Sequence, residues 1–173
     1  GEDSPERFVA AFYRKYKDSY PPIWMSAELM SIGLISKWYD NLGETSLRKA
    51  IASEIGLSHQ VLSSFLRIFT VLRNGAAHHA RIWNRQTSLR VAKIQKPPEL
   101  LEAPLFEADP SRMQYVLVIA AYIVQQVDPT SAATTSLKKH LLTADEAWLI
   151  EMDFPEAFEE AAIWNPQHIR QSK

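Results

Sequence analysis

The residues best suited to chemistry stand together between Leu72 and Arg85. This stretch holds three arginines, two histidines, two asparagines and no acidic residue. Histidine can take or give a proton near neutral pH, and an arginine, which is always charged, can hold a phosphate. Such a set supports cleavage of an RNA phosphodiester bond. Histidine would act on the 2′-hydroxyl or the departing 5′-oxygen, while arginine stabilises charge on the non-bridging oxygens.

The spacing of these residues predicts how they would be presented. If residues 72–85 are helical, one face carries four of them at spacings of four, three and four, namely Asn74, His78, Arg81 and Arg85. Arg73 precedes His78 by five residues, which places it about 140° round an ideal helix. These two side chains therefore converge only if the helix opens near Gly75 or if a second chain supplies one of them.

Arg73 and His78 are therefore candidates for catalysis, and the alternative is a structural histidine beside solvent-exposed arginines. The supporting or RNA-binding residues are predicted to be Asn74, His79, Arg81, Asn84 and Arg85. No metal or other cofactor is expected, because His78 and His79 are adjacent and no carboxylate lies near them in sequence.

Charge is segregated along a chain whose net charge is only −1. Seven arginines and lysines and no acid lie between Glu54 and Glu99, whereas residues 145–160 hold seven carboxylates and no lysine or arginine. An acid-free basic segment is typical of proteins that bind polyanions. Two alternatives to catalysis follow from it. One is a non-catalytic RNA-binding module that uses the basic face 67–96, and the other is an interaction domain whose basic face pairs only with its own acidic part.

The amino-acid composition excludes several other kinds of protein and of functional site. The 173 residues include no cysteine, which excludes disulfides, cysteine zinc sites and a thiol nucleophile, and predicts a cytoplasmic protein. The five glycines are scattered, so a Walker loop or dinucleotide fingerprint is absent. The longest apolar run, residues 115–124, is half of what a membrane helix needs, and no signal peptide opens the printed chain.

The hydrophobic pattern is helical throughout and predicts an all-α bundle in a single domain, residues 1–173. The expected helices cover residues 5–17, 23–39 with a bend near Gly33, 45–56, 58 to about 85, 110–127, 131–142, a segment opened by a capping box at 143–146, and 154–164. Residues 86–109 contain three prolines and no clear period, so we expect a long irregular loop there.

At these residues the chain resembles known families. Arg73-Asn74-Gly75-Ala76-Ala77-His78 has the form R-N-x-x-x-H, which is similar to the signature of the HEPN superfamily of all-α ribonucleases. The flanking segments 20–25, 28–36, 39–42 and 72–85, with 153–155 and Trp164, resemble the Abi-like family of AbiD/AbiF type. The resemblance spans about residues 8–165 and is most specific in the first ninety.

The resemblance implies a concrete function. HEPN ribonucleases commonly form homodimers in which two R-x(4–6)-H motifs build one composite, metal-independent site. The implied activity is an endoribonuclease whose 2′-hydroxyl attack leaves a 2′,3′-cyclic phosphate. The implied role is phage defence by abortive infection, as a toxin restrained by an antitoxin protein or a structured RNA. The resemblance also implies that the printed chain is the C-terminal part of a longer one.

Overall fold

A computed structural model describes residues 6–83 and 88–166, and within these ranges it contains helices and no strand. The all-α prediction is therefore confirmed. The α-helices are α1 (Arg7–Lys15), α2 (Ile23–Glu28), α3 (Ile32–Asp40), α4 (Thr45–Ser53), α5 (His59–Ala77), α6 (Glu99–Glu102), α7 (Met113–Val127), α8 (Ala133–Leu142) and α9 (Glu146–Glu151). Two 3-10 turns, η1 (Phe158–Glu160) and η2 (Ala162–Trp164), follow them.

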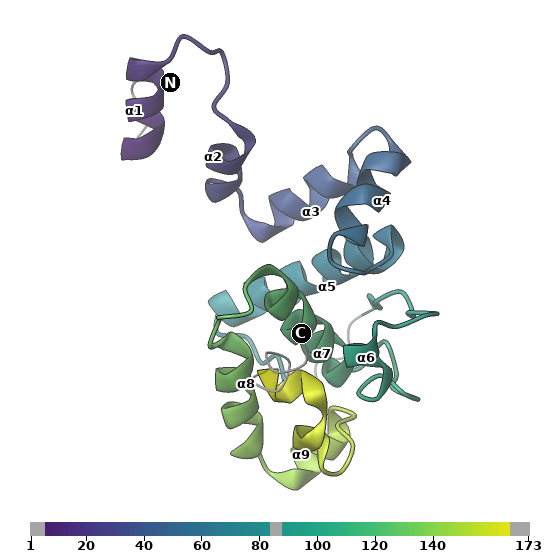
Figure 1. Ribbon diagram of the computed structural model, residues 1–173. Helices are drawn as coiled ribbons and strands as arrows, with labels where there is room; N and C mark the ends of the chain where they lie inside the picture. The colour runs from purple at the N-terminus through teal and green to yellow at the C-terminus, as the bar shows by residue number, and fades with distance from the viewer. Residues whose placement is uncertain (1–5, 84–87, 167–173) are drawn as a thin grey trace.

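Helix α7, whose sequence is apolar almost throughout, lies at the centre of the main core. It packs against α5, α6, α8 and η2 (Figure 1). The deepest side chains of this core are Leu101, Ile119 and Ile163, none of which has any exposed surface. Among the described helices, none combines the length and the hydropathy that crossing a bilayer requires.

A smaller core joins α3, α4 and α5 through Tyr39, Ala52 and Leu62. Gly56 closes the segment after α4 with a φ of +68°, a left-handed conformation that glycine adopts without strain. A side chain there would also collide with the Tyr122 hydroxyl, which donates a 2.9 Å hydrogen bond to the Ile55 carbonyl. Gly56 thus lets α7 approach the end of α4.

Helices α1 and α2 lie outside the body formed by α3 to α9 (Figure 1). Neither contributes a side chain to the two cores. Apolar side chains are accordingly exposed on α1 to α3 and their connections, including Tyr20, Ile23, Trp24, Leu29 and Leu34. The tryptophans differ in burial: Trp24 is 69% exposed, whereas Trp164 is 2% exposed and lies in the core.

One predicted helix, residues 23–39, is in fact two. Helix α2 ends at Glu28, and Ser31 caps α3 by accepting a 3.2 Å hydrogen bond from the Leu34 amide on its side-chain oxygen. A serine hydroxyl competes with helical hydrogen bonding inside a helix but satisfies a free amide at its start. The break therefore falls before Gly33 rather than at it.

The remaining boundaries differ from the prediction in smaller ways. The predicted loop 86–109 is largely irregular where it is described, from residue 88, but includes the single turn α6. Asp145, and not the Thr143 of the capping box, caps α9 through a 2.9 Å bond from the Ala147 amide. The last predicted helix is replaced by the two 3-10 turns, and the single-domain assignment stays a prediction.

Candidate active site

The predicted catalytic pair lies at the exposed C-terminal end of α5. Arg73 and Asn74 stand in its last turns, and the amide of His78 still donates a 3.1 Å helical hydrogen bond to the Asn74 carbonyl. All three residues are exposed. The structure thus places Asn74 and His78 one turn apart on one helix face, as their spacing predicted.

The helix does not continue to Arg85, and this part of the prediction is wrong. His79 takes a left-handed conformation with φ 56°, and the Ala80 amide turns back to donate a 2.8 Å hydrogen bond to the Gly75 carbonyl. Together with the bond from the His79 amide to the Ala76 carbonyl, this is a Schellman cap, which ends a helix. Arg81 therefore leaves the face that carries Asn74 and His78. Asn84 and Arg85 lie outside the described residues.

Arg73 does not meet His78 within one chain. Its Nη1 donates a 3.2 Å hydrogen bond to the Asn74 side-chain oxygen, and no hydrogen bond or ion pair joins it to His78, both residues being described. Helix α5 also runs unbroken through Gly75. Of the two ways in which the pair could converge, the opening of the turn near Gly75 is therefore excluded.

Downstream of the motif, a contact between two tryptophans joins the basic segment to α9. Trp83 stacks on Trp148 with ring centroids 5.1 Å apart and an angle of 22° between the planes. The Arg81 guanidinium lies 6.0 Å from the Trp83 ring centre, in the range of a cation–π contact. Trp83 is thus held against α9, in the acidic C-terminal part, by an aromatic contact.

Among residues 6–83 and 88–166, no salt bridge joins the basic residues 67–96 to the acidic residues 145–160, and Arg67 pairs with Asp40 on α3. The interpretation in which the basic face pairs with the acidic part of the same chain stays open.

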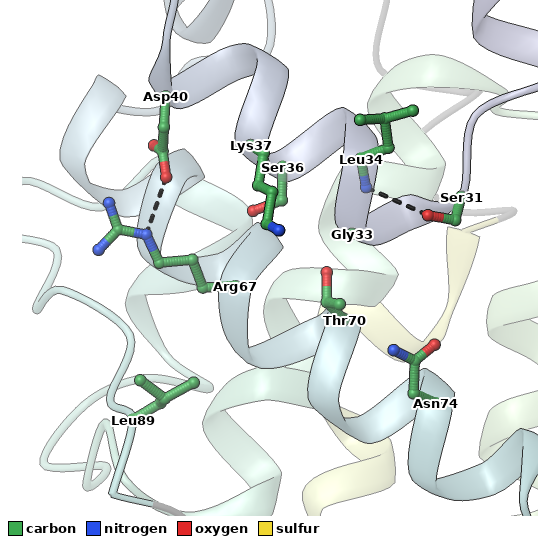
Figure 2. Close-up of a pocket in the computed structure, with 10 residues that line it drawn as sticks. All are labelled: Ser31, Gly33, Leu34, Ser36, Lys37, Asp40, Arg67, Thr70, Asn74 and Leu89. Atoms are coloured by element: carbon green, nitrogen blue, oxygen red, sulfur yellow. Dashed lines mark hydrogen bonds and ion pairs between the residues drawn. The ribbon is translucent and has the colours of Figure 1, made fainter.

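A groove of about 700 Å³ lies between α3 and α5, next to the motif (Figure 2). One wall of the groove is formed by side chains three and four positions apart on α5. The opposite wall is formed by residues of α3 and its N-terminal cap. The lining residues are Ser31, Gly33, Leu34, Ser36, Lys37 and Asp40 from α3 and its cap, Arg67, Thr70 and Asn74 from α5, and Leu89. Because Asn74 belongs both to the groove and to the motif, the groove leads along α5 toward His78.

Asp40 fixes one end of this groove. It accepts a 2.9 Å hydrogen bond from Nε of Arg67 and a 2.5 Å hydrogen bond from the Ser63 hydroxyl. Partial burial alone would raise the pKa of Asp40, but the hydrogen bonds from Ser63 and Arg67 outweigh it and lower the pKa below its usual value. The carboxylate is therefore ionised at neutral pH and orients the Arg67 guanidinium.

Sequence reasoning missed the groove residues on α3. A signal existed on α5, since Arg67, Thr70, Asn74 and His78 recur at spacings of three, four and four on one face. Nothing in the sequence pairs Asp40 with Arg67, which lies 27 positions further on. In the described part of the chain, no three histidine, cysteine or acidic residues gather as metal ligands, and metal independence stays a prediction.

Comparison with known proteins bears on the first part of the chain. Residues 2–84 match the Abi-like protein family. The match supports the Abi-like resemblance and includes the whole motif from Arg73 to His78, while the helices after Asn84 lie outside it. No curated protein and no solved structure matches the chain.

Proposed function

We propose that this protein is a metal-independent endoribonuclease of HEPN type that acts in phage defence by abortive infection. The observation that carries the proposal is the exposed pair Arg73 and His78 at the end of α5, inside the segment that matches the Abi-like family. An arginine and a histidine suffice for transesterification of RNA, because the ribose supplies its own nucleophile.

In the proposed reaction, His78 moves the protons and Arg73 binds the scissile phosphate. The 2′-oxygen loses its proton and forms a bond to phosphorus, and the bond from phosphorus to the 5′-oxygen breaks. The leaving 5′-oxygen gains a proton, so the products are a 2′,3′-cyclic phosphate and a 5′-hydroxyl. The exposed positions of both side chains leave room for a strand to reach them.

The site is proposed to be composite, with Arg73 from one copy of the chain and His78 from a second. Two observations support this arrangement. Helix α5 does not open at Gly75, so a second chain is the remaining way to bring the two side chains together. The exposed apolar side chains of α1 to α3 also provide surface that a second copy could bury.

The activity is tested by incubating the protein with total tRNA and a generic single-stranded RNA in EDTA. Wild type should cleave and leave cyclic-phosphate ends. His78→Ala should not cleave but should bind RNA with nearly the same affinity, since a neutral histidine adds little to phosphate binding. His140→Ala, an exposed histidine on α8, is the matched control and should cleave normally.

The composite site is tested by mixing two inactive variants. The composite site of a symmetric dimer contains two Arg73–His78 pairs, and a dimer of one Arg73→Ala chain and one His78→Ala chain keeps one of them intact. Half of the dimers are mixed after random exchange of equal amounts, so about a quarter of wild-type activity should return if each pair acts independently. A mixture that stays inactive although the subunits exchange would refute the composite site.

The alternative is a non-catalytic RNA-binding module that uses the basic face 67–96. One observation favours this alternative: the Arg73 side chain donates a hydrogen bond to the Asn74 side chain and makes no hydrogen bond with His78, which the structure also describes. If neither wild type nor His78→Ala cleaves RNA while both bind it in a salt-dependent way, this alternative replaces the nuclease. As a toxin the protein would also need restraint, and we propose an antitoxin protein or a structured RNA as its partner.

A further inference from the structure

The groove between α3 and α5 has the composition of a nucleotide site. It contains two cations, Lys37 and Arg67, and one carboxylate, Asp40, so one positive charge remains unbalanced. Its volume of about 700 Å³ lies within the range of about 300–1,000 Å³ that holds small ligands in proteins. A phosphate-bearing ligand with a flat base would match both properties.

Lys37 is a cation of the groove whose charge is not paired with any other residue that the structure describes. Figure 2 shows its side chain running from α3 toward α5, and its ammonium makes no hydrogen bond or ion pair with any other described residue. Arg67 is bonded to Asp40 only through Nε among the described residues, which leaves its two Nη groups available to an anion. The carboxylate thus fixes the guanidinium without covering its outer edge.

The rest of the groove suits a base rather than a second charge. Leu34, on the same side of the groove as Asn74 in Figure 2, presents partly exposed apolar surface on which the face of a base can lie, and Leu89 presents a second such surface at the opposite side. The Asn74 side-chain nitrogen donates to no other described residue, and Figure 2 shows the amide directed toward α3. An unpaired amide donor beside apolar surface can recognise an acceptor on the edge of an unstacked base.

The floor of the groove is set by the smallest residue on α3. A Cβ atom on Gly33 would lie 3.1 Å from the methyl group of Thr70, so glycine lets the two helices approach closely here. Ser36, beside it, is almost fully buried. Apart from Leu89, which belongs to the irregular segment after α5, the groove is bounded by the packed surfaces of α3 and α5, so these two walls are in place before a ligand enters.

We infer that this groove binds a nucleotide of single-stranded RNA next to the scissile phosphate, with Lys37 and Arg67 on the strand's phosphate and Asn74 on its base. The inference rests on the proposed function, because Asn74 lies one helical turn before His78 and a strand seated in the groove would continue to that residue. A base must leave its stack to enter, so a duplex is excluded and the groove selects the nucleotide beside the cut.

The test measures binding of a labelled single-stranded oligoribonucleotide, of the same RNA as a duplex, and of adenosine monophosphate. All measurements use the His78→Ala protein so that no cleavage intervenes. Lys37→Glu should weaken single-strand binding by about tenfold or more at low salt, since it replaces an attraction by a repulsion. Lys49→Glu, an exposed lysine on α4 outside the groove, carries the same charge change and should have a much smaller effect.

Three results would overturn the inference. The first is equal single-strand binding by the Lys37→Glu and Lys49→Glu proteins, and the second is duplex binding as tight as single-strand binding. The third is binding of adenosine monophosphate as tight as binding of the strand, a result that would assign the groove to a free nucleotide. Because Lys37 is exposed, Lys37→Glu should fold normally, and Lys37→Gln provides a milder second variant.

Cleavage assays of the same substitutions in the His78 protein separate the two proposals. If the groove binds a nucleotide of the RNA substrate, Lys37→Glu raises KM much more than it lowers kcat. If wild type cleaves and Lys37→Glu cleaves with unchanged KM, the groove inference fails while the nuclease stands. If wild type does not cleave but Lys37→Glu still abolishes single-strand binding, the nuclease fails while the groove stands.

Discussion

Replacing Asp40 with alanine should loosen the contact between α3 and α5 that forms the groove. Two interactions would be lost, and their magnitudes differ. The Ser63 hydroxyl donates to the carboxylate in a half-buried position, and a hydrogen bond to a charged group is worth about 1.5–3 kcal/mol. The Arg67 side chain is 58% exposed, so its ion pair with Asp40 adds only about 0.2–1 kcal/mol. We expect a total loss of about 2–4 kcal/mol in the free energy of unfolding.

The assay is urea unfolding of wild type, Asp40→Ala, Ser63→Ala, Arg67→Ala and the two double variants that include Asp40. The m-value should stay constant, since the change removes contacts without altering the surface exposed on unfolding. The coupling energy of Asp40 with Ser63 should exceed that of Asp40 with Arg67. A Ser63 coupling below about 0.5 kcal/mol would refute the reasoning, because sites without direct interaction already differ from additivity by that much.

The pH dependence gives an independent check. The folded-state pKa of Asp40 is lowered relative to the unfolded chain, where an aspartate titrates near about pH 4. A carboxyl group of this kind stabilises the protein above its unfolded pKa and loses that effect as the pH falls through its folded pKa. The stability difference between wild type and Asp40→Ala should therefore be constant between about pH 5 and 8 and shrink below about pH 4. A difference that does not shrink as the pH falls below about 4 would contradict the assignment.

Two further substitutions test other parts of the structure. Arg81→Ala should weaken binding to all RNA sequences alike. It should also reduce the slope of log affinity against log salt concentration by about 0.7, which is the value for one phosphate contact on a single strand. An unchanged slope would show that Arg81 does not belong to the RNA-binding surface. Gly33→Val should cost about 1–3 kcal/mol of stability and weaken single-strand binding, because its side chain would press on Thr70. Gly43→Val is the matched control, since a Cβ atom at Gly43 meets nothing within 4 Å, and equal losses in urea unfolding would show that packing at Gly33 is not the cause.

The sequence alone determined the helical class and the local part of the site. The start of α5 at Ser58, whose side chain accepts a hydrogen bond from the Val61 amide, and the shared face of Asn74 and His78 both follow from relations between residues three or four apart. Such patterns are local, because a helix places neighbours at fixed intervals whatever else surrounds it. The positions of Arg73, Asn74 and His78 were therefore predictable from the chain.

The tertiary structure decided what these residues face. Periodicity did not reveal that the left-handed conformation of His79 ends α5 before Arg81, since the pattern of polar side chains continues past that point. It also did not reveal the contact of Asp40 with Ser63 and Arg67, 23 and 27 positions away, or the groove beside it. Such contacts depend on how two helices pack, and packing is set by the shapes of many distant side chains rather than by any local repeat.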